Sequence, residues 1–310
     1  MHSHEQHNCG GQDHSHDAGH VHIHPVTGNL KVAFALNLSF TIIEIIGGFF
    51  TNSVAILSDA VHDLGDSIAI GASLWMEKYS QKGRSTSFSY GYKRFSPLAA
   101  FISSLILVIG SVFIISSAIP RLADPQPVHA NGMIWLAVLG VFFNGLAVLK
   151  LGRSGNSLNQ KAVMLHLLED ALGWIAVLAG SVIMYYTEWY WIDPLLSLAI
   201  AALILYNAIR NLIATLKLFM QSVPAGVDQE RIIGQLSVLG GIKAVHDLHA
   251  WSLDGSYNVA SVHLVIDEVT TAEDQKKLRH DAVHVLQHNN VHHATVQLEY
   301  ENEHCGLQEC

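Results

Sequence analysis

Two histidine–aspartate pairs inside apolar stretches are the residues best placed for chemistry. His62 and Asp66 are four residues apart in one stretch, and His166 and Asp170 are four residues apart in another. Four residues are about one turn of a helix, so each pair shares one helix face. Two imidazoles and two carboxylates from neighbouring helices form a tetrahedral donor set of the kind that Zn²⁺ prefers. The spacing therefore predicts a zinc site whose two carboxylates balance one divalent cation.

The same four side chains can hold protons when the metal is absent. Histidine titrates near neutral pH, and uncompensated charge inside a bilayer is costly. The alternative is that each polar residue only hydrogen-bonds to a neighbouring helix. For the nearby acidic residues we expect either orientation of the ligands or structural ion pairs; these are Asp59, Asp63 and Glu169. Glu44 is expected to hold helices together, and Asp193 to mark a helix end.

Histidine is the over-represented residue type, and this favours a divalent transition metal as partner. The chain has 20 histidines against 17 lysines and arginines together. Its formal net charge is −9, and it has no basic stripe, so nucleic acid is not an expected partner. Its three cysteines are too few for a disulfide framework.

The composition is that of a membrane protein. Half of the residues are hydrophobic, 14% are charged and the mean hydropathy is +0.30, whereas about 25% charged residues is usual in soluble domains. This excludes an ordinary cytosolic enzyme. Residues 29–220 are expected to form an α-helical membrane domain with six transmembrane helices, at about 31–50, 54–77, 96–119, 132–151, 161–187 and 191–219.

The distribution of lysine and arginine predicts the orientation. Both 78–94 and 150–161 are rich in these residues, whereas the opposite side has Arg121. By the positive-inside rule, both termini are then cytoplasmic. Residues 1–28 are a polar, histidine-rich tail without the features of a signal peptide. We expect this tail to be disordered, to capture metal, and to be dispensable for the function of the membrane domain itself.

Residues 221–310 have the composition of a soluble domain. A helix is expected after Asp228, followed by two strands joined around Asp254 and Gly255, a second helix at about 272–288 and a last strand at 294–300. This α-β-β-α-β order predicts a small α+β domain of ferredoxin-like fold. Pairing with a second copy would enlarge its modest core.

Several motifs together resemble the cation diffusion facilitator family, and within it the zinc-transporting branch. Besides the two intramembrane pairs, these are the run Phe88–Tyr92, the stretch Val245–Leu253 and the segment Ala294–Glu299. The resemblance implies a homodimeric zinc/proton antiporter that exports metal by alternating access through the four intramembrane residues. Relatives with aspartate in place of His62 also accept cadmium, so this histidine implies a preference for zinc.

The resemblance also implies further metal ligands outside the membrane. His246, His263 and Glu299 are expected to meet in a site that stabilises the dimer or reports cytoplasmic zinc. The alternative is scattered surface histidines. A looser terminal site, or simply an unstructured end, is expected for His304, Cys305, Cys310, His7 and Cys9. His280 and His284 are either a metal clamp or part of a solvated helix face.

Two differences from other members of the family bear on the number of metal sites and on the source of the protein. The segment 78–95 has neither histidine nor aspartate, so no extra site is assigned there. The segment 152–160 has no long histidine-rich loop, which favours a bacterial inner-membrane protein over a eukaryotic one.

Other functions remain as alternatives. A membrane zinc protease would need His-Glu-x-x-His, which does not occur, so the chain is not expected to be an enzyme. A membrane metal sensor without transport and an exporter of broader range (Cd²⁺, Co²⁺, Ni²⁺ or Fe²⁺) are the remaining readings.

Overall fold

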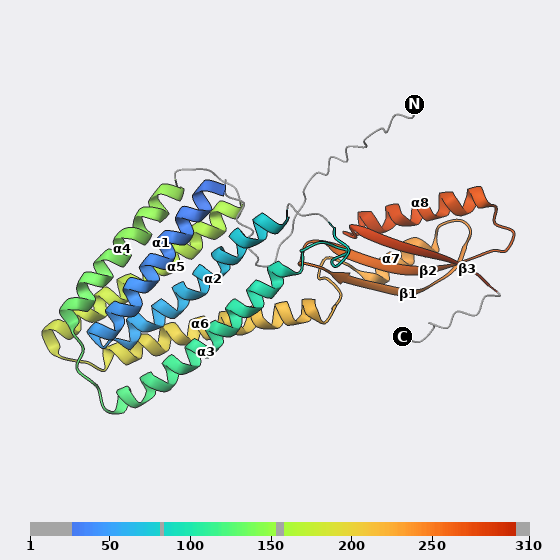
Figure 1. Cartoon of the computed structure of the whole chain (residues 1–310). Coiled ribbons are helices and arrows are strands. Elements are labelled where there is room, and N and C mark those ends of the chain that lie inside the picture. The colour runs from blue at the N-terminus through green and yellow to red at the C-terminus, as the bar shows by residue number, and fades with distance from the viewer. Residues whose placement is uncertain (1–26, 81–83, 153–157, 302–310) are drawn as a thin grey trace.

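The computed structural model describes residues 27–80, 84–152 and 158–301, which form a helical domain followed by a smaller domain with a sheet (Figure 1). The expected disordered tail lies almost wholly outside these residues. The helical domain has six long helices: α1 (Thr27–Thr51), α2 (Val54–Ser80), α3 (Phe95–Ala123), α4 (Ala130–Gly152), α5 (Leu158–Thr187) and α6 (Ile192–Phe219).

Four of these helices are long and apolar enough to cross a membrane, namely α1, α3, α5 and α6. In α4 the apolar part is the shorter segment Ala130–Leu146. In α2 the aspartates at 59, 63 and 66 interrupt the apolar sequence. The helix positions agree closely with the sequence-based ranges, and the polar residues that weaken α2 as a span are those with candidate functions.

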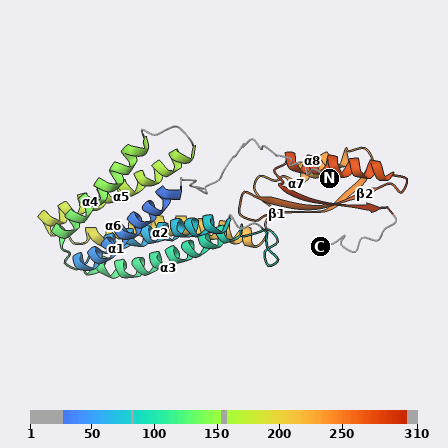
Figure 2. The same cartoon turned by 45° about the horizontal axis from the view of Figure 1, so that its top comes forward.

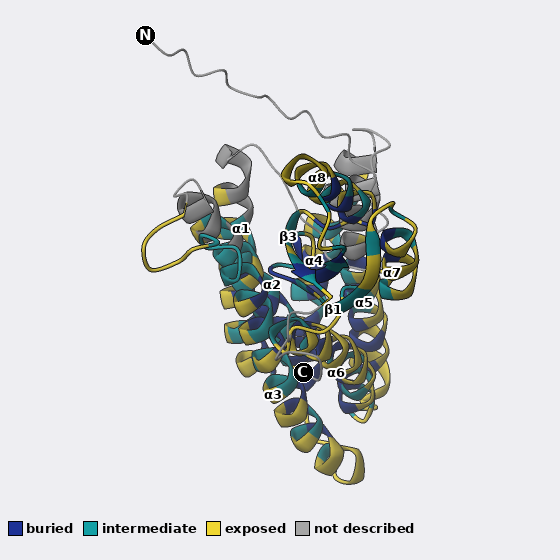
Figure 3. Ribbon diagram, turned by 90° about the vertical axis from the view of Figure 1, so that its right-hand side faces the viewer, coloured by how far each residue is buried: buried dark blue, intermediate teal, exposed yellow. Residues whose placement is uncertain are grey.

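The helices pack in pairs, α1 with α2, α3 with α6 and α4 with α5 (Figure 2). α2 also packs against α3 and α6. Close approach is needed where Gly140 of α4 faces Trp174 of α5, because a Cβ at this glycine would overlap the indole ring. Exposed residues lie along the outer faces of the helices (Figure 3), and many of them are large and apolar, as a lipid-facing domain requires.

Asp193 lies in the first turn of α6, as expected for a residue at a helix end, and it also caps the start of α2. Its carboxylate accepts hydrogen bonds from the hydroxyl of Ser53 (2.5 Å) and from the backbone N–H groups of Val54 (2.8 Å) and Ala55 (3.3 Å). The first N–H groups of a helix have no partner within the helix, so this carboxylate completes the start of α2. The side chain is fully buried and joins α6 to the helix that carries His62.

The C-terminal domain has the expected α-β-β-α-β order. Its elements are α7 (Gln229–Ser237), β1 (Ile242–Ser252), β2 (Asn258–Ile266), α8 (Ala272–His288) and β3 (His293–Tyr300). The sheet order is β1-β2-β3, with β1 antiparallel and β3 parallel to β2. The side chains of Asp228 and Thr271 accept backbone hydrogen bonds at the starts of α7 and α8, as expected for N-caps.

The turn between β1 and β2 contacts the segment that precedes α3. Lys93 Nζ lies 3.7 Å from Asp254 Oδ2 and 4.2 Å from the ring centre of Tyr257. Burial tends to raise the pKa of Asp254. Its carboxylate also accepts hydrogen bonds from the N–H groups of Tyr257 and Ser256 and from the Ser256 hydroxyl, and it faces the charge of Lys93. Together these interactions outweigh the effect of burial, so the pKa of Asp254 lies below its usual value.

Candidate functional site

Residues from α2 and α5 meet inside the helical domain. His62 Nε2 lies 3.8 Å from Asp66 Oδ2 on its own helix and 3.4 Å from Asp170 Oδ1 on α5. The side chains of His62 and Asp66 are 27% and 28% exposed, and that of Asp170 is 12% exposed. The cluster is therefore partly exposed, although it lies within an apolar helical domain.

The fourth predicted ligand, His166, lies on α5 one turn before Asp170. Its side chain is outside the described residues. The structure thus brings His62, Asp66 and Asp170 together across two helices that are separate in sequence. These three residues offer one imidazole nitrogen and two carboxylates. His166 is four residues from Asp170, as His62 is from Asp66, and this spacing is that of a ligand pair on one helix.

Other acidic residues on α1 and α2 surround this cluster. Asp59 and Asp63 of α2 are buried, and Glu44 of α1 is fully buried and interacts electrostatically with both. Glu44 was expected to hold helices together rather than to bind metal, and its position on α1 beside Asp59 and Asp63 of α2 adds a third carboxylate next to the cluster. Glu169, in contrast, is exposed on α5. This exposure argues against a role for Glu169 in orienting the ligands.

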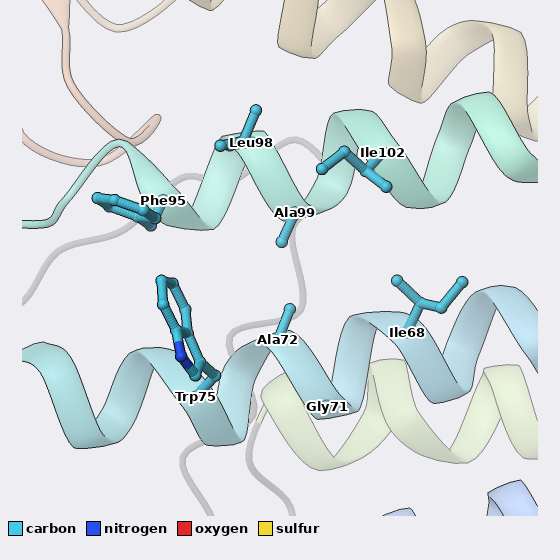
Figure 4. Close-up of a pocket in the computed structure, with 8 residues that line it drawn as sticks. All are labelled: Ile68, Gly71, Ala72, Trp75, Phe95, Leu98, Ala99 and Ile102. Atoms are coloured by element: carbon cyan, nitrogen blue, oxygen red, sulfur yellow. The ribbon is translucent and has the colours of Figure 1, made fainter.

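The hollow between α2 and α3 is not a second cation site. It has a volume of about 450 Å³ and is lined by side chains such as Ile68, Trp75, Phe95 and Leu98 (Figure 4). Hydrocarbon groups dominate this lining, and the indole nitrogen of Trp75 is a donor only. The hollow therefore offers no ligand atom to a cation.

The C-terminal domain brings together the other predicted trio. His246 and His263 pair directly across β1 and β2. Glu299 on β3 reaches both, with 3.1 Å from Oε2 to His246 Nε2 and 2.8 Å from Oε1 to His263 Nδ1. One ligand atom from each residue lies within 4.8 Å of the others, which is compact enough to hold a metal ion. His263 and Glu299 are buried and His246 is partly buried, so the trio is not a set of scattered surface residues.

Asp247 is a neighbour of this trio that the sequence analysis did not single out. The pairing of β1 with β2 is irregular between His246 and His249, and Asp247 has a φ of 51° there. Its Oδ2 lies 3.5 Å from His263 Nε2, and its Oδ1 lies 2.7 Å from His249 Nε2. His246 and Asp247 are adjacent in the sequence, but in a regular strand neighbouring side chains point to opposite faces of the sheet, so the sequence alone does not predict that both lie near His263.

The predicted ligands of the terminal site lie outside the described residues, and they are His304, Cys305, Cys310, His7 and Cys9.

Comparisons with known proteins cover nearly the whole chain. Residues 30–220 match the cation efflux transmembrane domain, and residues 224–301 match the cation efflux protein cytoplasmic domain. A cadmium, cobalt and zinc/H(+)-K(+) antiporter of Bacillus subtilis (strain 168) is 34% identical over 278 residues, 88% of each chain.

Two further relatives have similar extents. The zinc transporter ZitB of Escherichia coli (strain K12) is 30% identical over 303 residues, 96% of each chain. The metal cation efflux system protein CzcD of Cupriavidus metallidurans is 35% identical over 261 residues, 83% of this chain and 82% of the relative. Both domains match, and the matches span more than four fifths of these relatives. The chain therefore belongs to the cation efflux family, the cation diffusion facilitators that its sequence motifs resemble.

Proposed function

We propose that this protein exports Zn²⁺ in exchange for protons by alternating access at His62, Asp66, His166 and Asp170. The observation that carries the proposal is the position of the His62 imidazole, within 4 Å of aspartates on two different helices of an apolar domain. Such a donor set suits a tetrahedral zinc ion. Zinc is here the transported substrate, and the names of the relatives support metal transport.

The exchange follows from the charge of the four ligands. When zinc is bound, two carboxylates balance its two positive charges. When zinc leaves, the same side chains are left without a counter-charge, and protons bound to them restore the balance. Because α2 and α5 each provide part of the donor set, a relative movement of these helices changes the site. Metal binding and helix arrangement are thereby coupled.

The remaining architecture completes the proposal. In this proposal all six long helices cross the bilayer and both termini lie in the cytoplasm. The membrane is the inner membrane of a bacterium. Residues 221–310 form a ferredoxin-like cytoplasmic domain that pairs with a second copy, which the family match of this domain supports. His246, His263 and Glu299 hold a regulatory or structural zinc ion in that domain.

A second candidate is an exporter of broader range. It is favoured by relatives whose names include cadmium and cobalt as well as zinc. A sensor without transport is less well supported, because it would not need ligand pairs in the middle of two apolar helices.

Zinc uptake into proteoliposomes under an imposed pH gradient tests the proposed site. We expect Asp66→Asn and Asp170→Asn each to abolish uptake. Glu169→Gln is the matched control, because it removes an exposed carboxylate next to Asp170 on the same helix, and it should retain uptake. Normal transport by both aspartate variants would overturn the site, as would an equal loss in the control.

A further inference from the structure

A row of three exposed histidines runs along the outer face of α8. His280, His284 and His288 follow one another at intervals of four residues, so they lie above one another on consecutive turns. Their rings are neighbours, with centroids 5.8 Å apart for His280 and His284 and 5.1 Å apart for His284 and His288.

This row and the cluster around Glu299 lie on opposite sides of the C-terminal domain. Ala282 and Leu286 of α8 pack in one core with Val262 and Leu264 of β2 (Figure 1). Side chains alternate along a strand, so His263, between these two β2 residues, points to the other face of the sheet. The sheet and the core therefore separate the two groups of histidines, and the row on α8 is independent of the trio.

The spacing of the rings suits a shared metal ion. A metal about 2.0–2.1 Å from one nitrogen of each ring holds the two ring centres about 4.5–5.2 Å apart, for ligand angles of about 90–110°. The separation of 5.1 Å between His284 and His288 already falls in this range. The separation of 5.8 Å between His280 and His284 needs only a small side-chain rotation.

The surrounding charge favours the pair near the end of the helix. His288 lies in the last turn of α8, where the helix dipole attracts a cation. Lys276 lies one turn before His280 on the same face, and its positive charge opposes metal binding there. His284 and His288 are thus the better pair, and His284 is common to both pairs.

We propose that the outer face of α8 is a second metal site of the C-terminal domain, with His284 and His288 as ligands and His280 as the alternative partner of His284. The ligand is a divalent transition metal that binds imidazole, such as Zn²⁺, Ni²⁺ or Cu²⁺. Two protein ligands leave the other positions to water, so this site binds more weakly than the trio at Glu299. It fills only when metal is abundant, and it goes beyond the proposed transport function and does not depend on it.

Zinc protection of the full-length protein in detergent tests the site at single residues. Diethyl pyrocarbonate modifies accessible histidines, and mass spectrometry reads each one separately. We expect zinc to protect His284 and His288 together, at a higher concentration than the one that protects the partly exposed His246. His292 is the internal control, because it is exposed, lies beyond the end of α8 and has its Nδ1 engaged by the N–H of Asn258, so its reactivity should not change with zinc.

Substitutions then separate a shared ligand from general shielding. His284→Gln should abolish protection of both His280 and His288, whereas His280→Gln should leave the protection of the other two unchanged. His288→Gln should retain protection of His280 and His284, but only at higher zinc. If His288 stays protected in the His284→Gln protein, or if millimolar zinc protects none of the row, the proposal is wrong.

Discussion

Replacing Asp193 with alanine is expected to destabilise the helical domain, because its carboxylate caps the start of α2. The carboxylate accepts three hydrogen bonds at the start of α2, from Ser53, Val54 and Ala55. A hydrogen bond to a carboxylate contributes about 1.5–3 kcal/mol, but bonds at one group are not additive. The hydroxyl of Ser53 also accepts from the N–H of Ile56, which keeps part of the cap. We therefore expect the free energy of unfolding to fall by about 3 kcal/mol for Asp193→Ala.

Thermal unfolding of the purified protein in detergent, followed by tryptophan fluorescence, measures this effect. A loss of this size lowers the melting temperature by roughly 6–12 °C in a protein of this size class. Ser197→Ala is the matched control. Ser197 is buried one turn further along α6, and its hydroxyl has no hydrogen-bond partner within the described part of the chain.

The control variant should melt within about 2 °C of the parent protein, because it breaks no hydrogen bond. If Asp193→Ala is no less stable than Ser197→Ala, the carboxylate does not hold the start of α2. α6 would then not stabilise the start of the helix that carries His62.

Three further changes probe other parts of the molecule. Asp254→Asn should cost about 1–2 kcal/mol at neutral pH, because the carboxylate loses the charge that Lys93 faces. Because the pKa of Asp254 is lower in the folded protein than in the unfolded chain, this contribution is present above the pKa of the unfolded chain and is lost as the pH falls below about 4. The free energies of unfolding of parent and variant, measured with urea, should therefore converge in acid. Glu299→Gln should weaken zinc binding in the C-terminal domain about 10–100-fold, and an unchanged zinc stoichiometry and affinity in calorimetry would contradict the trio. His62→Asp should raise the ratio of cadmium to zinc transport in vesicles. An unchanged ratio would contradict a role of His62 in the preference for zinc.

The sequence predicted the elements well because their boundaries depend on local chemistry. Asp228 and Thr271 cap the two helices of the C-terminal domain, and Gly255 in the hairpin turn has a φ of 94°, which glycine adopts without strain. The α-β-β-α-β order followed from these local features. The six long helices followed from the length of each apolar run.

What the sequence did not predict depends on contacts between distant segments. Asp193 caps a helix that begins 139 residues earlier, at Val54, and no local pattern contains that contact. The role of Asp247 depends on an irregularity in strand pairing. Glu44 showed only as a carboxyl group in an apolar run, and its place beside Asp59 and Asp63 comes from the packing of α1 on α2.

Coupling between zinc and proton movement is the most direct test of the proposed exchange. Purified protein in vesicles with an acidic interior should take up zinc while protons leave, with both fluxes recorded by dyes in the same sample. We predict that proton exit begins only when zinc is added, and that Asp170→Asn abolishes both fluxes together. Zinc uptake that is independent of the pH gradient and moves no protons would contradict the account.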